Sequence, residues 1–252
     1  MSNFYDRVAK EFGGYGFSNS EPKYRSVFID IDPEKLFKKL IIDNSNVTNT
    51  ALDIGCGDGK FSFQIAKYFK QLTGLDSSRG LIDIANKKLI EYDTNNIEFI
   101  FGNASKMPIK SGSINLAFNR RGPSFYKEYY RILKVKGLYI EIGIGEKDAM
   151  PLKQIFKRGQ NYGDWIKERT DLDTKTFKDL GFNVKSAINV FYKEFYKNKD
   201  EFSLFLRGVP IFEDFDPAKD KELLESYYAK FELQTGEIEL DRHRVVYLLE
   251  KL

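Results

Sequence analysis

The sequence predicts an α/β protein with a mostly parallel sheet, and three observations lead to that prediction. A short apolar run, Ala51–Ile54, is followed by three glycines at alternate positions and then by apolar residues at helical spacing. From there to residue 143, segments typical of strands alternate with segments typical of helices, an order that builds a parallel sheet with helices on both faces. The length of 252 residues suits one large domain with a cap.

Composition places the chain among soluble globular proteins, with 42% apolar and 31% charged residues. No apolar run approaches the roughly 18 residues of a membrane span. The first residues mix acids with bases and lack an apolar core, so we expect no signal peptide and a cytoplasmic location. A single Cys excludes an intrachain disulfide. With only one Cys and one His, we also expect no Cys/His metal cluster.

The first segment, residues 1–32, is rich in aromatic and polar residues and contains a Gly13-Gly14 break. It shows no convincing amphipathic helix, and we expect it to fold over the domain as a lid. Asp32-Pro33 then starts a helix that runs to about Ile42, because proline is favoured in the first turn. The main domain is expected to span 33–252.

The central elements follow from apolar periodicity and turn residues. Ser77-Ser78 supplies a cap for the second helix after the glycines. The expected order is strand 50–54, helix 60–69, strand 71–75, helix 78–90, strand 97–101, strand 113–118, helix 123–133 and strand 137–143.

The last part of the chain predicts three further elements and an insertion. We expect helices near 149–158 and at 174–180, the second ending at the C-cap glycine Gly181, and then a strand over 183–192. Residues 196–241 are too long for a hairpin and include a helix from Pro217 to Phe231, so they are expected to form a cap near the site. A strand at 244–250 closes the chain.

The glycine turn narrows the class of ligand. A dinucleotide fingerprint, G-x-G-x-x-G, has its third glycine one residue later than this chain does, and a phosphate-binding loop needs glycine where Ile54 stands and Ser or Thr where Phe61 stands. The remaining pattern is D-x-G-x-G-x-G, with Asp76 ending the next strand. It resembles motifs I and II of the class I S-adenosylmethionine-dependent methyltransferases.

The resemblance continues downstream over roughly residues 35–195. Gly102-Asn103-Ala104 followed by Met107-Pro108 is similar to the adenine-contacting turn, and residues 131–142 are similar to the last helix, turn and fifth strand of the central pattern. The resemblance implies a Rossmann-like, mostly parallel seven-stranded sheet, with the final strand antiparallel between strands five and six. Shorter segments, including Asn119-Arg-Arg-Gly and Arg242-His-Arg, look similar to stand-alone methyltransferase-domain proteins.

The resemblance also implies the residues that bind S-adenosylmethionine. The backbone of the glycine turn would approach the methionine moiety, with Asp53 beneath it facing the ammonium group, and Asp76 would accept hydrogen bonds from the ribose hydroxyls. Asn103 departs from the acid often found at its position, although its amide oxygen can still accept a hydrogen bond from adenine. Cys56 is interpreted as a small buried residue rather than a nucleophile. The expected cofactor-binding residues are Asp53, Gly55, Cys56, Gly57, Asp76, Ser77, Asn103, Ala104 and Asn119.

Methyl transfer is an in-line displacement that mainly requires alignment of donor and acceptor, with proton removal where the acceptor needs it. The chain lacks the motifs typical of base amine, cytosine C5 and zinc-assisted thiol methylation. Weak catalytic candidates are His243, Arg120 and Asn119. Arg120 and Arg121 can bind a carboxylate or phosphate, or can instead pair with an acid of the lid. A lone strand histidine is more often structural.

Two functions from different classes stand beside a methyltransferase acting on a small molecule. Residues 101–200 carry 20 Lys and Arg against 11 Asp and Glu, which allows RNA as the acceptor, although such charges more often form a solvated face. A non-catalytic S-adenosylmethionine-binding regulator is the other alternative. The sequence leaves the acceptor, any catalytic base and the oligomeric state open.

Overall fold

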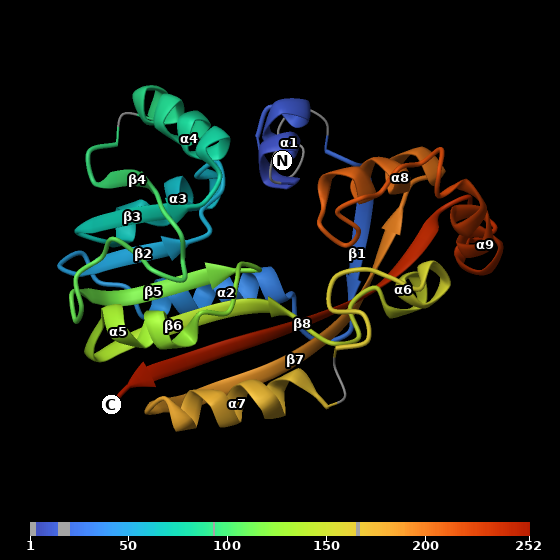
Figure 1. The fold of residues 1–252 in the computed structure, drawn as a ribbon. Helices are drawn as coiled ribbons and strands as arrows, with labels where there is room; N and C mark the ends of the chain where they lie inside the picture. The colour runs from blue at the N-terminus through green and yellow to red at the C-terminus, as the bar shows by residue number, and fades with distance from the viewer. Residues whose placement is uncertain (1–3, 15–20, 93, 165–166) are drawn as a thin grey trace.

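A computed structural model describes residues 4–14, 21–92, 94–164 and 167–252 of the chain. Its described strands form one eight-stranded sheet in the order β1-β7-β8-β6-β5-β2-β3-β4. The neighbours from β6 to β4 pair in parallel, whereas β1, β7 and β8 pair antiparallel with their neighbours. Figure 1 shows helices on both faces of this sheet, which confirms the predicted α/β class.

The cofactor half of the sheet follows the predicted elements closely. Its glycine turn lies between the end of β2 and the start of α3. In chain order this half comprises α2 (Pro33–Asp43), β2 (Thr50–Ile54), α3 (Lys60–Ile65), the short helix η1 (Ala66–Tyr68), β3 (Gln71–Asp76), α4 (Arg79–Tyr92) and β4 (Ile97–Phe101).

The second half contains longer strands than the sequence predicted. β7 and β8 pair along their whole length, so their ends extend beyond the segments that β-propensity alone marked. The elements are β5 (Ile114–Arg120), α5 (Tyr126–Ile132), β6 (Leu133–Ile144), α6 (Met150–Phe156), α7 (Arg169–Asp179), β7 (Phe182–Tyr196), α8 (Lys199–Gly208), α9 (Lys221–Phe231) and β8 (Ile238–Lys251). As expected, β8 lies between β6 and β7.

The expectation of seven strands was wrong by one, because β1 (Tyr24–Phe28) pairs with the second half of β7. Those residues fall within the segment predicted to be a lid. The expectation of no amphipathic helix there was also wrong. α1 (Phe4–Phe12) buries Phe4, Val8 and Phe12 on one face, at a spacing of four residues. Residues 1–3 and 15–20 of this segment lie outside the described residues.

Two apolar layers enclose the sheet. The layer on the α2 and α3 face contains Phe37, Phe118 and Val246, and the layer on the α5 and α7 face contains Tyr129, Phe177 and Tyr247. Successive residues of a strand point to opposite faces, so each strand contributes to both layers. This alternation decides which side chains meet at the site described below.

A third apolar cluster joins α1 to the part of the chain between β7 and β8. It combines residues of α1, α6, α8 and α9 with the loop at Ile211–Phe215. In Figure 1 these elements gather beyond the right-hand ends of β2 and β5, and α1 lies between α4 and α8. The ends of the central strands therefore face a region bounded by α1 on one side and by residues 197–237 on another.

Candidate functional site

The turn after β2 has the backbone shape that its glycines predicted. Gly55, Gly57 and Gly59 all have positive φ angles, of 76°, 57° and 76°, which residues with side chains rarely adopt. The amides of Gly55 and Cys56 both donate to the Leu75 carbonyl, at 2.8 and 3.1 Å. These bonds hold the turn against the end of β3.

Asp76 at the end of β3 reaches the same turn. Its Oδ2 atom accepts a hydrogen bond from the Gly57 amide at 2.9 Å, and its Oδ1 atom accepts one from the Ser78 amide at 2.8 Å. Burial raises the pKa of Asp76, although these backbone donors act in the opposite direction. Ser77 lies beside it and is exposed. The structure thus brings the predicted ribose acid into direct contact with the predicted turn.

Asp53 lies beneath the turn and is buried, with 2% of its surface exposed. Its Oδ2 atom accepts a hydrogen bond from the Ser62 hydroxyl at 2.6 Å. Burial raises the pKa of its carboxyl to about 7, while the Ser62 bond and the charge of Arg120 lower it. A carboxyl with this pKa gains or loses its charge near neutral pH, so a cation beside it would favour the charged form.

Two further residues of the turn, Cys56 and Asp58, are buried. Cys56 is buried, and burial raises the pKa of its thiol well above the usual value, which fits the interpretation of a packed residue rather than a nucleophile. Asp58, which the sequence analysis did not single out, is 3% exposed and pairs with Lys88 of α4 at 2.6 Å. The position of this acid between Gly57 and Gly59 is the sequence signal from which its structural role could have been predicted.

The predicted adenine turn follows β4. Asn103 is exposed, and its Oδ1 atom accepts a hydrogen bond from the Ser105 amide at 2.8 Å. Ala104 is buried against the α5 face of the sheet. The Gly102 amide donates to the Asp76 carbonyl at 2.9 Å, so this turn lies next to the ribose acid.

Asn119 lies near the end of β5, where it is fully buried. Its Oδ1 atom accepts from the Gly122 amide at 2.7 Å, and its Nδ2 atom donates to the Pro123 carbonyl at 2.8 Å. These bonds fold the chain back after β5, with Arg121 at a φ of 60°. The side chain therefore shapes the turn after β5.

The adjacent arginines share one acidic partner. Arg120 Nε lies 3.1 Å from Glu34 Oε2, and Arg121 Nη1 lies 2.6 Å from Glu34 Oε1. Burial raises the pKa of Glu34, but the charges of Arg121, Arg120, Arg244 and Arg242 lower it, so that the net shift is downward. Glu34 is in the first turn of α2, just after the segment in which the sequence analysis placed a possible acidic partner.

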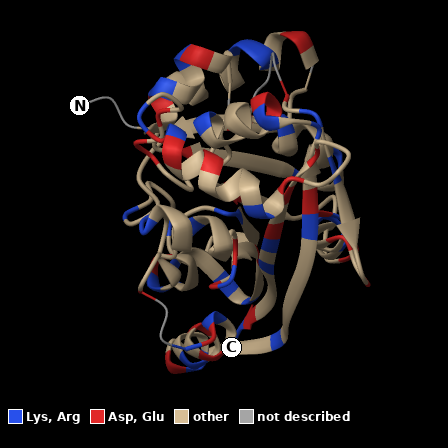
Figure 2. Cartoon of the chain, turned by 90° about the vertical axis from the view of Figure 1, so that its right-hand side faces the viewer, with Lys and Arg blue, Asp and Glu red and all other residues tan. Residues whose placement is uncertain are grey.

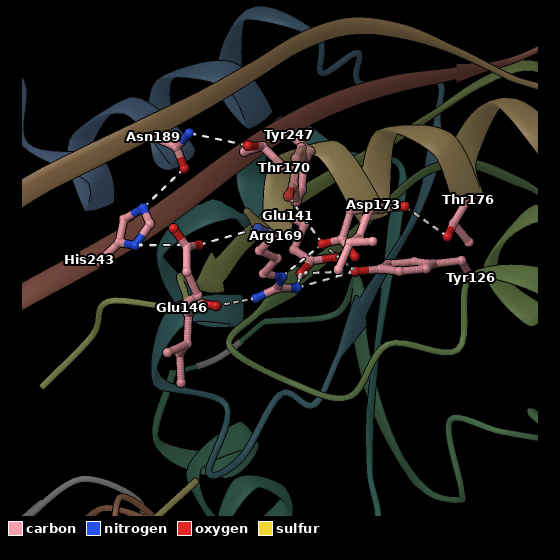
Figure 3. A network of polar contacts seen from close by, with 12 residues as sticks. Tyr126, Glu141, Glu146, Arg169, Thr170, Asp173, Thr176, Asn189, His243 and Tyr247 are labelled. Atoms are coloured by element: carbon pink, nitrogen blue, oxygen red, sulfur yellow. Dashed lines mark hydrogen bonds and ion pairs between the residues drawn. The ribbon is translucent and has the colours of Figure 1, made fainter. Parts of the chain in front are cut away.

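His243 lies on the opposite face of the sheet from Asp53. Its Nδ1 atom accepts a hydrogen bond from the Lys147 amide at 3.2 Å, and its Nε2 atom is 3.0 Å from the Asn189 Oδ1 atom. Figure 3 shows it at the edge of a polar network that continues through Arg169 to α7. Burial lowers its pKa to about 4, so the ring is neutral and accepts from Lys147. These contacts favour a structural role.

A contact of α1 with the cofactor half was not foreseen. The Ser78 hydroxyl donates a hydrogen bond to Asp6 Oδ1, two residues from Asp76. Glu11, near the other end of α1, pairs with Arg207 of α8, and the Arg7 guanidinium donates to the Glu213 carbonyl at 2.6 Å. α1 therefore links the start of α4 to residues 197–237.

Residues 51–137 match the family model of a methyltransferase domain. This range contains the glycine turn, Asp76, the turn at Asn103 and Asn119. Residues 51–137 therefore form a methyltransferase domain.

Among curated relatives, this methyltransferase chain is similar to the demethylmenaquinone methyltransferase of Oceanobacillus iheyensis. The two are 28% identical over 154 residues, which are 56% of this chain and 65% of that protein. The match thus spans a little less than two thirds of the relative's own length, so it does not establish the methyl acceptor of this chain.

Solved structures share the fold. A methyltransferase-like protein from Bacillus halodurans superposes with a TM-score of 0.65 at 16% identity, covering 85% of this chain and 98% of its own. A geranyl diphosphate methyltransferase in complex with S-adenosylmethionine superposes with a TM-score of 0.55 at 15% identity, covering 87% and 86%. At these identities the likeness shows the fold of this methyltransferase and not its acceptor.

Proposed function

We propose that this protein transfers the methyl group of S-adenosylmethionine to a small-molecule acceptor. The observation that carries the proposal is the meeting of the glycine turn, Asp53 and Asp76 at the carboxyl ends of β2 and β3, the edge at which open α/β sheets bind ligands. The methyltransferase domain matched by residues 51–137 supports the same cofactor.

Each cofactor residue has a role in this proposal. The backbone of Gly55, Cys56 and Gly57 approaches the methionine part, with Asp53 close to its ammonium group. Asp76 and Ser77 bind the ribose, because a carboxylate at this place can accept from both hydroxyls. The turn at Asn103 and Ala104 contacts the adenine. Asn119 acts by shaping the turn beside the methyl group.

Positioning is the main source of catalysis in the proposed reaction. The sulfonium is a good leaving group, so the protein must chiefly hold the acceptor atom in line with the methyl carbon and exclude water. α1 and residues 197–237 flank the strand ends and supply the lid and cap for this purpose. A site flanked in this way on two sides favours a small acceptor over a polymer.

The charge distribution gives the RNA alternative little support. The arginines of the basic region pair with carboxylates, and in the view of Figure 2 Lys and Arg alternate with Asp and Glu along the helices. The pairs within the described residues are Arg120 and Arg121 with Glu34, Arg131 with Glu128, Arg158 with Asp220, and Arg169 with Glu141 and Asp173.

The first experiment is incubation of the protein with methyl-tritiated S-adenosylmethionine and a cell extract, followed by size fractionation and ribonuclease treatment. We expect label in the small-molecule fraction. The Asp76→Ala variant is expected to bind S-adenosylhomocysteine roughly tenfold to a hundredfold more weakly, because a charge-assisted hydrogen bond is lost.

Other outcomes decide between the alternatives. Ribonuclease-sensitive label would overturn the small-molecule acceptor in favour of RNA. Tight cofactor binding without any labelled fraction would favour a non-catalytic regulator. Unchanged affinity in Asp76→Ala would contradict the cofactor site itself.

A further inference from the structure

Arg242 and Arg244 of β8 are a pair of buried guanidinium groups near the proposed acceptor region. Their side chains are only 7% and 2% exposed. Residues two apart in a strand point to the same face of the sheet. Followed from strand to strand through Arg120, the register places Arg242 and Arg244 on the same face as Asp53. The pair therefore lies on the cofactor side of the sheet, opposite to His243.

The two guanidinium groups share the carboxylate of Asp148, and some of their nitrogen atoms have no hydrogen bond. Arg244 Nη1 donates to Asp148 Oδ1 at 2.6 Å. Arg242 Nε lies 3.1 Å from the same oxygen, and Arg242 Nη1 lies 3.3 Å from Glu194 Oε2, but both are ion-pair contacts without hydrogen-bond geometry. Asp148 Oδ1 is thus shared by both arginines.

Three buried donors remain unsatisfied as a result. Arg242 Nε, Arg242 Nη1 and Arg244 Nε have no hydrogen-bond acceptor within the described part of the chain. Buried polar groups in folded proteins are nearly always hydrogen-bonded, so three unpaired donors on two neighbouring arginines indicate a place for a further acceptor. Because all three belong to cations, an anion satisfies them best.

The local charge balance points the same way. Lys153 is also buried there, at 3% exposed, so three cationic side chains face the two carboxylates Asp148 and Glu194. The carboxylate of Glu34 also interacts with the pair, but it is neutralised by its own ion pairs with Arg120 and Arg121. Burial raises the pKa of Asp148, but Arg242, Arg244 and Lys153 lower it to about 2 overall, which keeps this acid charged at all working pH values. The cluster therefore has an excess of positive charge when both carboxylates are ionised.

We propose that Arg242 and Arg244 bind an oxyanion, a carboxylate or a phosphate, carried by the methyl acceptor. The proposal rests on the function proposed above. A guanidinium group presents planar donors that match the oxygens of either anion. Asp53 and the pair lie on strands three positions apart, ~14 Å across the sheet, and Arg244 is four residues along β8 from the position in register with Asp53, a further ~13 Å. The anion would therefore hold the far end of an extended acceptor whose reacting atom is near the glycine turn.

Calorimetric titration of the full-length protein, saturated with S-adenosylhomocysteine and held at constant ionic strength, tests the proposal. The probes are inorganic phosphate, pyrophosphate and succinate, and the one that binds distinguishes a phosphate from a carboxylate acceptor. We expect Arg242→Met and Arg244→Met to weaken its binding by about tenfold or more, because charge-assisted hydrogen bonds are lost, with S-adenosylhomocysteine affinity unchanged.

The matched control is Arg25→Met on β1, whose guanidinium is 51% exposed and pairs with Glu237, and it should leave anion binding unchanged. If a methionine variant does not fold, the Arg→Lys variant keeps the charge but loses the planar donors, and it should also weaken binding. Absence of binding by every probe, or unchanged binding in folded variants, would overturn the proposal. If S-adenosylhomocysteine itself does not bind, the proposed function fails, and the same titration without it still tests the anion site.

Discussion

At the scale of single residues, burial shifts the pKa in opposite directions for two of the titratable groups that the sequence analysis singled out. It raises the pKa of Asp53 to about 7 and lowers that of His243 to about 4. Asp53 is on the face that carries the cofactor turn, whereas His243 is on the face that packs against α7. Both groups are therefore expected to give measurable pH effects, one on binding and one on stability.

Cofactor affinity should depend on the protonation of Asp53. If the ammonium of S-adenosylhomocysteine lies beside this carboxyl, binding favours the charged form and releases a proton below pH 7. Affinity should then rise about tenfold from about pH 6 to about pH 8, since the free carboxyl ionises across that window. Isothermal titration at several pH values measures this.

The Asp53→Asn variant separates this effect from other titrations. It should bind S-adenosylhomocysteine more weakly at high pH and show a flat pH profile. A wild-type profile that is already flat, or a slope that persists in the variant, would place the ammonium elsewhere.

Acid stability should depend on His243. Its pKa is lowered on folding, so the unfolded chain binds more protons and stability is lost as pH falls through the unfolded value of about 6.5 towards about 4. The shift accounts for about 2 kcal/mol of lost stability between about pH 7 and about pH 5. Denaturant unfolding of the wild type and of His243→Gln at both pH values measures the difference.

His243→Gln is expected to lose less stability than the wild type over that range and to keep its methyl-transfer activity. A variant that folds and binds S-adenosylhomocysteine but has lost turnover would contradict the structural role and restore His243 as a base.

Sequence reasoning could predict the contacts that depend on local spacing. Asp76 follows the glycine turn at a fixed distance along two neighbouring parallel strands, so their contact could be foreseen. The partner of Arg120 and Arg121 could not, because Glu34 comes from a helix more than 80 positions earlier and only tertiary packing brings it there. The shared oxygen of Asp148 depends on β8 lying beside β6, which spacing along the chain does not reveal.

At the scale of elements, α1 is the contact between the two sides of the proposed site. It packs against the first turn of α4, where a Cβ atom on Gly80 would lie 3.6 Å from Ala9. Its other face contributes Phe4, Val8 and Phe12 to the cluster formed with α8 and α9. A helix held on both sides can close over a bound cofactor without belonging to the sheet.

Loss of the Asp6 contact should weaken cofactor binding. Asp6→Ala removes the hydrogen bond from Ser78, and we expect S-adenosylhomocysteine affinity to fall about threefold to tenfold, the effect of one hydrogen bond. Asp43→Ala, which removes an exposed ion pair within α2, is the control. Calorimetric titration measures both, and equal affinities would show that α1 does not close over the cofactor.

Helices and strands could be predicted where the pattern of apolar residues and turn residues marks them, and could not be predicted where only tertiary contacts determine the element. β2 and β4 have the predicted bounds because they are short apolar strands between clear turn residues. β1 has the burial pattern of an exposed edge, with Tyr24 and Val27 largely exposed, so no alternation of buried residues marked it. Its pairing with β7 could be known only from the fold.

At the scale of the whole molecule, the excess of basic residues in the middle of the chain should not produce strong RNA binding. Its arginines are paired with carboxylates, and so are Lys136, Lys175, Lys185, Lys193 and Lys199, so fewer cations are left for the phosphate contacts that release counterions. Fluorescence anisotropy with a labelled oligoribonucleotide should show weak binding with a small dependence on salt. A steep fall of the binding constant with salt concentration would instead support RNA as the acceptor.

No described helix is long and apolar enough to cross a membrane. The match to the demethylmenaquinone methyltransferase covers only 56% of this chain and 65% of that enzyme. The methyltransferase family model covers residues 51–137, so the elements around the proposed acceptor site, α1, β1 and residues 197–237, have to be understood from their own contacts. The arginine pair of β8 is the part of that region whose chemistry is most specific.

The position of β8 also has a consequence for how the chain folds during synthesis. β8 follows the other described strands in the chain, yet it lies between β6 and β7 near the middle of the sheet. Strands β2 to β6 can pair before β8 has been synthesised, whereas β1 and β7 pair with that part of the sheet only through β8, among the described strands. The cofactor half can therefore form on the nascent chain, but β1 and β7 cannot join the sheet until β8 has been made.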